Sequence, residues 1–467
     1  MRFIAAIPLL GYRLVKMKIK LSSSPIFFQS KLLCFSVFYL LISITLAIYT
    51  TFYSTKCLFR SSPFDPIQSP LFYYNSSYGE HKYALPTYRT SCDSPVFFKD
   101  YGSVLDEMQR LIGNSKELGS HNLKYIKGYA DTFGGNFSIE KRFSYFDHGD
   151  EGTEIPCGFF KHFPVSNSDR IVMERCNGMV VVSVIFNEHD KIRQPKGLGS
   201  RTLDYVCFFM FVDDVTLKGL DYHNLISRKS KEYGIGVWRI VKVSNEHLYD
   251  NAAMNGIIPK YLVHRLFPNT KYSIWIDAKL QLVVDPLLLL HSLVIKEGNV
   301  DMAVSRHPIF LHTLEEATAT ARWKKWWDIE GLKTQMETYC GNGMEPWSPE
   351  KPYPSDVPDS ALIIRKHSVA SNLFSCLLFN ELDGFNPRDQ LPFAFIRDKM
   401  NPKMKMNMFH VEVFEQVALE YRHNLKHSSS GPSGGVRVKR AGSDLFVNGS
   451  SSKCDKYLLT IWGESHD

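Results

Sequence analysis

The sequence predicts an α/β protein in which a mostly parallel sheet is flanked by helices, behind a single transmembrane helix and a stem. Three observations predict this class. Residues 32–55 carry no charged side chain. From Cys176 onward, short apolar runs alternate with helical segments, which is the pattern of a parallel sheet covered on both faces. Several of these runs end in polar or charged residues, the position at which open α/β sheets bind ligands.

The uncharged segment 32–55 is long enough to cross a hydrocarbon core of ~30 Å as a helix. Only basic charges precede it: Arg2, Arg13, Lys16, Lys18, Lys20 and Lys31. Because positive charge stays on the cytosolic side, residues 1–31 are expected to form a cytosolic tail and the rest of the chain to be lumenal. A cleaved signal peptide is the alternative. It is less favoured, because the apolar run exceeds a signal core of about 7–15 residues and no small-residue cleavage site follows.

The composition is that of a globular protein, with 44% hydrophobic and 22% charged residues among 467. The formal net charge is +7. Subtracting the six basic residues of the tail from 55 leaves 49, against 48 acidic residues. The basic excess therefore reports membrane topology, and we expect no nucleic-acid partner.

Two further features fit a lumenal location. Asn75, Asn136 and Asn448 each begin an Asn-x-Ser triplet, the acceptor sequence for N-glycosylation. Eight cysteines follow Cys34, an even number that is compatible with disulfides in an oxidising compartment. No Cys-x-x-Cys spacing occurs, which argues against a zinc site of that kind.

Composition divides the rest of the chain into three segments. Residues 56–100 are rich in Pro, Ser and Tyr and are expected to be a stem, and residues 101–427 are expected to be the lumenal domain. Residues 428–467 begin with a Ser- and Gly-rich stretch and are expected to be mostly disordered. Within the domain, residues 101–113 suit an amphipathic helix and residues 131–152 suit a loop.

The regular part of the domain contains six expected strands, at 178–186, 205–214, 236–243, 272–277, 301–307 and 360–367. Two helices are expected between them. The first spans 251–268, with a kink at Pro259, because proline removes a helical hydrogen bond. The second spans 286–298, with Pro286 in its first turn.

Polar residues follow four of these strands and are expected to meet at one edge of the sheet. They are Asn187, Glu188, His189, Asp213, Asp214, Asp277, Lys279, Arg306 and His307. Such an edge suits a nucleotide-diphosphate donor, whose developing negative charge is neutralised by a divalent metal or by Lys and Arg. Each residue taken alone more often belongs to an ordinary turn at a strand end, and it is their convergence on one edge that favours a site.

Within Asp277-Ala278-Lys279, the residues Asp277 and Lys279 are the most informative about a metal or donor site. A metal-binding Asp-x-Asp would place an acid where Lys279 stands. Asp277 could supply one metal ligand and His307 another, while Lys279 could contact a phosphate. The alternatives are a capped strand end for Asp277 and a solvated surface residue for Lys279.

Two further carboxylates are candidates for catalysis. Asp359, like Asp356, comes just before the sixth strand, and Asp389 lies at the opening of an expected helix within 385–396. An acid at a helix start is first a cap, but at a pocket rim it is also a candidate general base for an acceptor hydroxyl. Three tryptophans in 321–331 suit stacking on sugars, although tryptophan at helical spacing is more often part of a core.

Several stretches together resemble a known plant family. They are CNGMVVVSVIFNEHDKIRQP, YSIWIDAKLQLVVDP, SRHPIF, ARWKKWW and PRDQLPFAF. These motifs are similar to those of the family that joins the Turgor Regulation Defect protein and a mucilage-related probable hexosyltransferase, over roughly residues 90–425 in order. The stretch before residue 102 is more similar to the turgor branch.

The resemblance implies a Golgi type II membrane protein with a type-A glycosyltransferase-like domain. It also implies two activities: hexosyl transfer from a nucleotide sugar to a cell-wall glycan, with Mn²⁺ as a candidate cofactor, or alkaline ceramidase activity on ceramide. No HExxH motif occurs, which favours glycosyl transfer. A non-catalytic scaffold is the third possibility. The expected donor-binding residues are Asn187, Asp213, Asp214, Asp277, Lys279 and Arg306. Asp277 and His307 are the expected metal ligands, and Asp359 and Asp389 the expected catalytic carboxylates.

Overall fold

The structure is a computed structural model of the chain. It describes residues 31–52, 58–59, 67, 78, 96–113, 123–128, 130–149, 152–226, 233–244, 248–421 and 454. These residues belong to two compact units, Met1–Thr55 and Lys56–Asp467. We describe each unit by itself.

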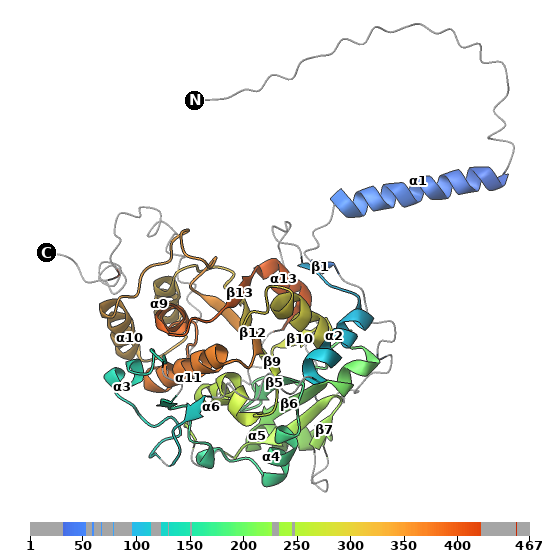
Figure 1. Cartoon of the computed structure of the whole chain (residues 1–467). Helices are drawn as coiled ribbons and strands as arrows, with labels where there is room; N and C mark the ends of the chain where they lie inside the picture. The colour runs from blue at the N-terminus through green and yellow to red at the C-terminus, as the bar shows by residue number, and fades with distance from the viewer. Residues whose placement is uncertain are drawn as a thin grey trace, which may run out of the picture. The chain divides into compact units, whose positions relative to one another are not determined.

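The first unit contains one helix, α1 (Lys31–Phe52), drawn in blue in Figure 1. Its apolar residues from Leu32 to Ile48 are exposed, and by length and composition it could cross a membrane. The predicted apolar helix is therefore present. Its cytosolic and lumenal sides stay a prediction, and the basic residues 1–30 lie outside the described residues.

The second unit is built on an eight-stranded sheet with the order β13-β11-β12-β9-β5-β6-β8-β7. Neighbours are parallel from β9 through β5 and β6 to β8, and β11 is parallel to β13. β12 runs antiparallel to both of its neighbours, and β7 is antiparallel to β8. The predicted mostly parallel sheet is confirmed. The strands are β5 (Met179–Ile185), β6 (Val206–Val212), β7 (Tyr233–Ile235), β8 (Trp238–Lys242), β9 (Tyr272–Ile276), β11 (Met302–Arg306), β12 (Pro358–Lys366) and β13 (Met406–Phe409).

The apolar runs form central strands because both of their faces are buried. In β5, Val180 and Val182 belong to one hydrophobic cluster, whereas Val181 and Ile185 belong to the cluster on the other face. Successive side chains of a strand point to opposite faces, so a strand covered on both sides must be apolar throughout. β-branched residues also suit the pleated backbone.

Helices supply the two covering layers. On one face, α6 (Ala252–Tyr261) and α11 (Val369–Gly384) contribute to the cluster that contains Val180. On the other face, α2 (Tyr101–Gly113), α8 (Pro286–Leu290) and α13 (Val411–Val417) contribute to the cluster that contains Val181. The helix predicted at 101–113 and the Pro286 start are both confirmed.

Three helical predictions differ from the structure. The segment 251–268 forms two helices rather than one: α6 contains Pro259, and the short α7 (Val263–Leu266) follows after Leu262. Leu262 leaves the helical region with φ −98° and ψ 24°. After α8, residues His291–Ile295 form a π-helical turn. The expected loop at 131–152 contains α3 (Ile139–Phe143), whose first turn is capped by the Ser138 side chain.

The remaining elements are short or lie at the edges of the unit. Among them, β10 (Leu280–Leu282) and β14 (Ala418–Glu420) pair antiparallel and bring the end of the domain beside residue 279. The others are α4 (Asn167–Glu174), α5 (Asp214–Tyr222), α9 (Thr313–Arg322), α10 (Ile329–Gly341), α12 (Phe393–Lys399), β1 (Leu58–Phe59), β2 (Val96–Phe97), β3 (Lys124–Tyr125), β4 (Glu154–Ile155) and the 3₁₀ turns Phe160–His162 and Ser200–Asp204.

Within the second unit, Ile67 and Tyr78 of the predicted stem contact the predicted lumenal domain, residues 101–427. The backbone N–H of Ile192 donates to the buried Tyr78 hydroxyl at 2.9 Å, and burial raises the pKa of Tyr78 to about 12. The Ile67 N–H donates to the carbonyl of Leu198. Composition did not predict these contacts, since a Tyr-rich stretch without periodicity gives no packing direction.

Disulfides join Cys157 to Cys376, Cys176 to Cys207 and Cys340 to Cys454. This agrees with the even number of cysteines beyond Cys34. Cys454 is the described residue of the segment 428–467, whose predicted disorder otherwise lies outside the described residues.

Candidate functional site

The candidate site lies at the edge of the sheet where β9 and β11 end. Asp277 follows β9 directly, and its backbone N–H donates to the carbonyl of Ala361 in β12 at 2.8 Å. Because β12 runs antiparallel to β9, the start of β12 lies at this same edge, and it brings Asp359 with it. Asp359 is thus inside β12 rather than before it, as the sequence had suggested.

Asp277 is oriented but still accessible. The indole Nε1–H of Trp275 donates to Asp277 Oδ1 at 2.7 Å, and the ammonium of Lys260 lies 3.7 Å from the same oxygen. The Asp277 side chain is 31% exposed. A carboxylate held in this way can contact a ligand without first breaking a buried network.

Lys279 lies among carboxylates. Its Nζ is 2.9 Å from Glu420 Oε1, a contact made possible by the pairing of β10 with β14. Burial alone would lower the pKa of Lys279, but the carboxylates of Asp277, Glu420 and Asp359 outweigh it, so this pKa lies above its ordinary value. The ammonium is therefore a fixed positive charge beside Asp277, close to where an Asp-x-Asp site would hold a metal ion.

Asp359 is the carboxylate best suited to proton transfer. Burial raises its pKa from 3.8 to about 6, although the nearby Lys279 acts in the opposite direction. Its Oδ1 accepts the backbone N–H of Ala361 at 3.2 Å. A pKa close to neutrality lets a group both accept and release a proton under physiological conditions.

Asp389, the other predicted catalytic acid, is committed to a buried network. Its Oδ2 accepts from the Tyr261 hydroxyl at 2.7 Å and from Ser360 Oγ at 2.9 Å, and it lies 2.7 Å from Lys260 Nζ. Burial would raise the pKa of Asp389, but Lys260 and these hydrogen bonds lower it below its ordinary value. This geometry suits a positioning residue better than a general base. Asp389 does not open α12, which begins at Phe393.

Lys260 lies close to both Asp277 and Asp389, and the sequence analysis did not identify it. Burial opposes its charge, but Asp277 and Asp389 hold its pKa above the ordinary value. A signal was present in the sequence: Lys260 is a charged residue inside the apolar segment 256–263. A cation in such a segment needs a buried partner.

His307 follows β11, and its surroundings do not suit a metal ligand. Its Nδ1 accepts the backbone N–H groups of Ile309 and Phe310, at 3.2 and 3.0 Å. Burial lowers the pKa of His307 to about 4, so the ring is neutral at pH 7 and its proton must lie on Nε2. His307 therefore presents a hydrogen-bond donor. Arg306 ends β11, and its buried Nε has no hydrogen-bond partner among the described residues.

A second charged network lies beside His307 and was also missed. Glu316 of α9 is fully buried, and its Oε1 accepts from Arg388, from Lys325 at 3.2 Å and from Thr320 at 3.2 Å. The network ties α9 to the turn that carries Asp389. The sequence could not reveal this network, because Glu316 and Arg388 are 72 residues apart along the chain.

Asn187, Asp213 and Asp214 follow β5 and β6, which run parallel to β9, so they lie at the same edge of the sheet as Asp277. Asp213 caps α5: its Oδ1 accepts the Thr216 N–H at 2.8 Å, and its Oδ2 accepts the Asn187 N–H at 2.9 Å. Both oxygens are thus engaged by the backbone. Asn187 adopts a left-handed φ of 54°, an uncommon conformation that this bond helps to hold. These bonds give Asp213 a structural part, and its hydrogen-bond partners are not those of Asp277.

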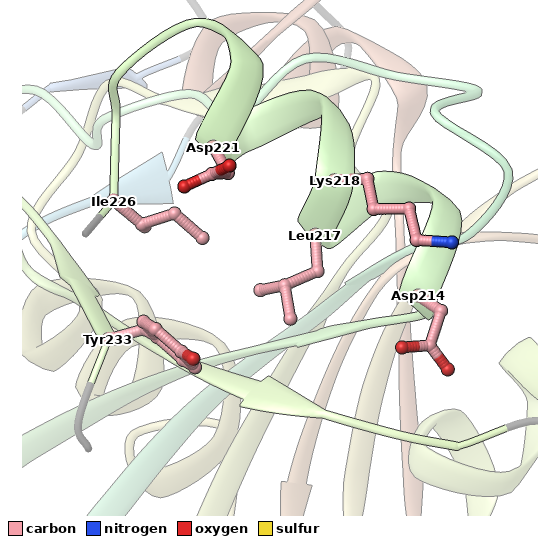
Figure 2. A pocket seen from close by; sticks show the side chains of 6 residues that line it. All are labelled: Asp214, Leu217, Lys218, Asp221, Ile226 and Tyr233. Atoms are coloured by element: carbon pink, nitrogen blue, oxygen red, sulfur yellow. The ribbon is translucent and has the colours of Figure 1, made fainter. Parts of the chain in front are cut away.

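Asp214 is 2.7 Å from Lys242 and lines an open pocket of about 330 Å³ beside α5. Figure 2 shows its carboxylate at the start of α5, with Tyr233 across the pocket. The other lining residues are Leu217, Lys218, Asp221 and Ile226. The predicted donor-binding residues therefore share one edge of the sheet, but the hydrogen bonds of Asp213 and the ion pair of Asp214 do not involve Asp277 or Lys279.

One group of potential metal ligands lies close enough for a single ion within the described part of the chain. It consists of Cys157, His264 and Cys376, whose ligand atoms lie within 4.8 Å of one another. The two sulfurs already share a disulfide, so only His264 is left to coordinate. The predicted metal pair, Asp277 and His307, is not part of such a group.

A family model and two related proteins all indicate the same family. Residues 119–423 match the family described as TOD1/MUCI70, glycosyltransferase-like domain. The chain is 57% identical to the Arabidopsis thaliana protein named alkaline ceramidase TOD1, over 94% of this chain and 98% of that protein. It is 38% identical to the probable hexosyltransferase MUCI70 of Arabidopsis thaliana, over 58% of this chain and 47% of that protein.

Similarity to solved structures is low. The apo form of mouse xyloside xylosyltransferase 1 matches 50% of this chain and 84% of that one, with 7% identity and a TM-score of 0.28. A similarity at that level carries no inference about this chain.

Proposed function

The chain belongs to the TOD1/MUCI70 glycosyltransferase-like family, and we propose that it transfers a hexosyl group from a nucleotide sugar to a glycan acceptor. The observation that carries the proposal is the cluster of Asp277, Lys279 and Asp359 at the edge of the sheet. It combines a fixed cation for a diphosphate with a carboxylate that can take a proton near neutral pH.

In the proposed reaction, Asp359 accepts the proton of an acceptor hydroxyl while that oxygen forms a bond to the anomeric carbon of the sugar. The bond from the anomeric carbon to the diphosphate breaks, and the leaving oxygen keeps the electron pair. Lys279 stabilises the negative charge that develops on the diphosphate, as a pre-organised charge does in many transferases. Asp277 orients the donor, and Lys260 and Asp389 hold Asp277 in place.

In this proposal Lys279 takes the part of a divalent metal. Its ammonium already balances the carboxylates of Asp277, Glu420 and Asp359, and His307 offers a donor where a ligand would be needed. Donor binding without Mn²⁺ is therefore the expectation for the wild type. A Golgi membrane location with a lumenal, glycosylated domain is part of the same proposal, supported by α1 and by the basic residues before it.

The test is a thermal-shift panel of sugar nucleotides on the purified full chain, with and without Mn²⁺. At least one donor should raise the Tm of the wild type. The Asp277→Asn variant should lose that shift, and its transfer activity should fall at least ~100-fold, because it removes a charge at constant volume. The matched control is Asp204→Asn, which changes an exposed carboxylate paired with Arg201 and should behave as the wild type.

A second candidate function is ceramide hydrolysis, favoured by the 57% identity to a protein named alkaline ceramidase. The same preparation should then release fatty acid from ceramide, and no sugar nucleotide should raise the Tm. A non-catalytic scaffold would show neither effect. If no donor stabilises the wild type with or without Mn²⁺, the hexosyl-transfer proposal is wrong.

A further inference from the structure

An exposed aromatic and basic surface lies next to the candidate site. Its apolar members are Ile309, Trp323 and Trp327, which are 61%, 52% and 78% exposed. Its basic members, Arg322 and Lys324, are also exposed. We call these five residues the aromatic-basic surface. Tryptophan is usually well buried, so two accessible tryptophans beside an accessible isoleucine indicate a partner.

The aromatic-basic surface is held rigidly against the sheet edge. The Phe310 ring stacks on His307, with centroids 5.1 Å apart and an interplanar angle of 11°, and lies 6.0 Å from the Trp323 ring. Lys325 lies over the Trp323 ring and is paired with the buried Glu316. A ligand that covers this surface would therefore lie beside the end of β11.

The charge of the surface is positive. Residues 321–327 contain three basic residues and no acidic one, and the charge of Lys325 is balanced by Glu316. Arg322 and Lys324, on either side of Trp323 in the sequence, remain exposed. Tryptophan with adjacent Lys or Arg is the combination that favours the interface of a bilayer with anionic lipid.

We propose that the aromatic-basic surface docks on a bilayer whose leaflet on the side of the second unit contains anionic phospholipid. The partner is identified by charge complementarity, by the exposed aliphatic Ile309 and by α1, which is long and apolar enough to hold the chain at a membrane. A sugar that stacks on tryptophan would need neither Ile309 nor two basic residues. The proposal goes beyond hexosyl transfer, because it concerns how the second unit meets the membrane. It implies that the site is placed to receive a lipid-borne substrate.

The seven tryptophans provide the reporter. None lies within residues 1–55, so α1 contributes no tryptophan emission. Trp238 and Trp275 are buried in the core. In nanodiscs made with brominated acyl chains, quenching of the full-length protein therefore reports contact between the second unit and the bilayer.

We expect brominated nanodiscs of phosphatidylcholine and phosphatidylserine to quench the wild type relative to unbrominated ones. The triple variant Trp323→Phe/Trp326→Phe/Trp327→Phe, which also removes the Trp326 ring 5.6 Å from that of Trp327, should lose this quenching. The control Trp347→Phe should keep it. Arg322→Gln with Lys324→Gln retains every tryptophan and should lower the docking equilibrium constant roughly 30-fold, as expected for two charges near an anionic surface. Unchanged Tm values would show that the variants are folded.

Equal emission of the wild type in brominated and unbrominated nanodiscs would overturn the proposal. So would quenching that persists in the Trp323→Phe/Trp326→Phe/Trp327→Phe variant. If xylo- or cello-oligosaccharides shift the emission while the brominated lipid does not, the surface binds saccharide and the proposal is wrong. The donor panel is independent of these outcomes, so failure of docking and failure of hexosyl transfer are distinguishable.

Discussion

Replacing Asp359 by Asn should abolish transfer and, at neutral pH, stabilise the fold. Asp359 is partly buried, and burial raises its pKa from 3.8 to about 6. This pKa difference corresponds to about 3 kcal/mol. The folded protein with a charged Asp359 is less stable to unfolding by that amount than the folded protein with a neutral Asp359. The Asp359→Asn variant keeps the volume and can still accept the Ala361 N–H, but it carries no charge.

The sign follows from proton binding. Because the pKa of Asp359 is higher in the folded state, the folded protein binds more protons between 3.8 and about 6, and the free energy of unfolding falls as the pH rises through that window. The variant lacks this loss. It should match the wild type near pH 4 and exceed it at pH 7 by up to about 3 kcal/mol, or roughly 3 °C in Tm for a unit of this size.

The assay is thermal denaturation of the full chain in detergent at about pH 4, 5 and 7, with Asp204→Asn as the matched surface control. Transfer by Asp359→Asn should fall by about 10²–10⁴-fold, the usual contribution of a general base. Wild-type activity should fall as the pH drops below about 6, because Asp359 is then protonated. A variant that is less stable at pH 7, or a stability difference that does not change with pH, would refute the reasoning.

Three further predictions concern other parts of the chain. Lys279→Asp restores an Asp-x-Asp spacing, so donor-induced thermal shifts should become dependent on Mn²⁺; unchanged, metal-free binding would contradict the part given to Lys279. Arg142→Met leaves the fully buried Glu381 without its cation and should cost about 3–5 kcal/mol in thermal unfolding, whereas Arg201→Ala, at an exposed pair, should have no measurable effect. Equal losses would refute this. Protease added to sealed microsomes should spare the second unit until detergent is present, and digestion without detergent would contradict the predicted topology.

The sequence predicted the central strands well because their physics is local. β5, β6 and β9 are apolar on both faces, and that pattern is legible in any short window. The edge strand β7 and the pair of β10 with β14 are three residues long each, too short for a period to appear. The antiparallel direction of β12 could not be predicted from sequence either. Side chains alternate between the two faces of a sheet in the same way in parallel and antiparallel strands.

Only those residues of the candidate site that directly follow a strand could be predicted from the sequence. Asp277 and Lys279 were found because they follow an apolar run. Glu420 lies 141 residues from Lys279 along the chain, and Asp389 lies 128 residues from Tyr261, so these contacts depend on the tertiary fold. Asp213 illustrates a second limit of sequence analysis, because a carboxylate that caps a helix cannot be distinguished from a ligand-binding one by sequence. The structure distinguishes Asp213, since both of its carboxylate oxygens accept backbone N–H groups.

The disulfide between Cys340 and Cys454 has a practical consequence for anyone who purifies this protein. It closes the chain between α10 and the C-terminal segment into a covalent loop that spans 114 residues. A protease that nicks the backbone within this loop leaves both pieces attached. Such a sample would migrate as an intact species on a non-reducing gel and separate into fragments only after treatment with a thiol. Integrity of the preparation should therefore be judged under reducing conditions.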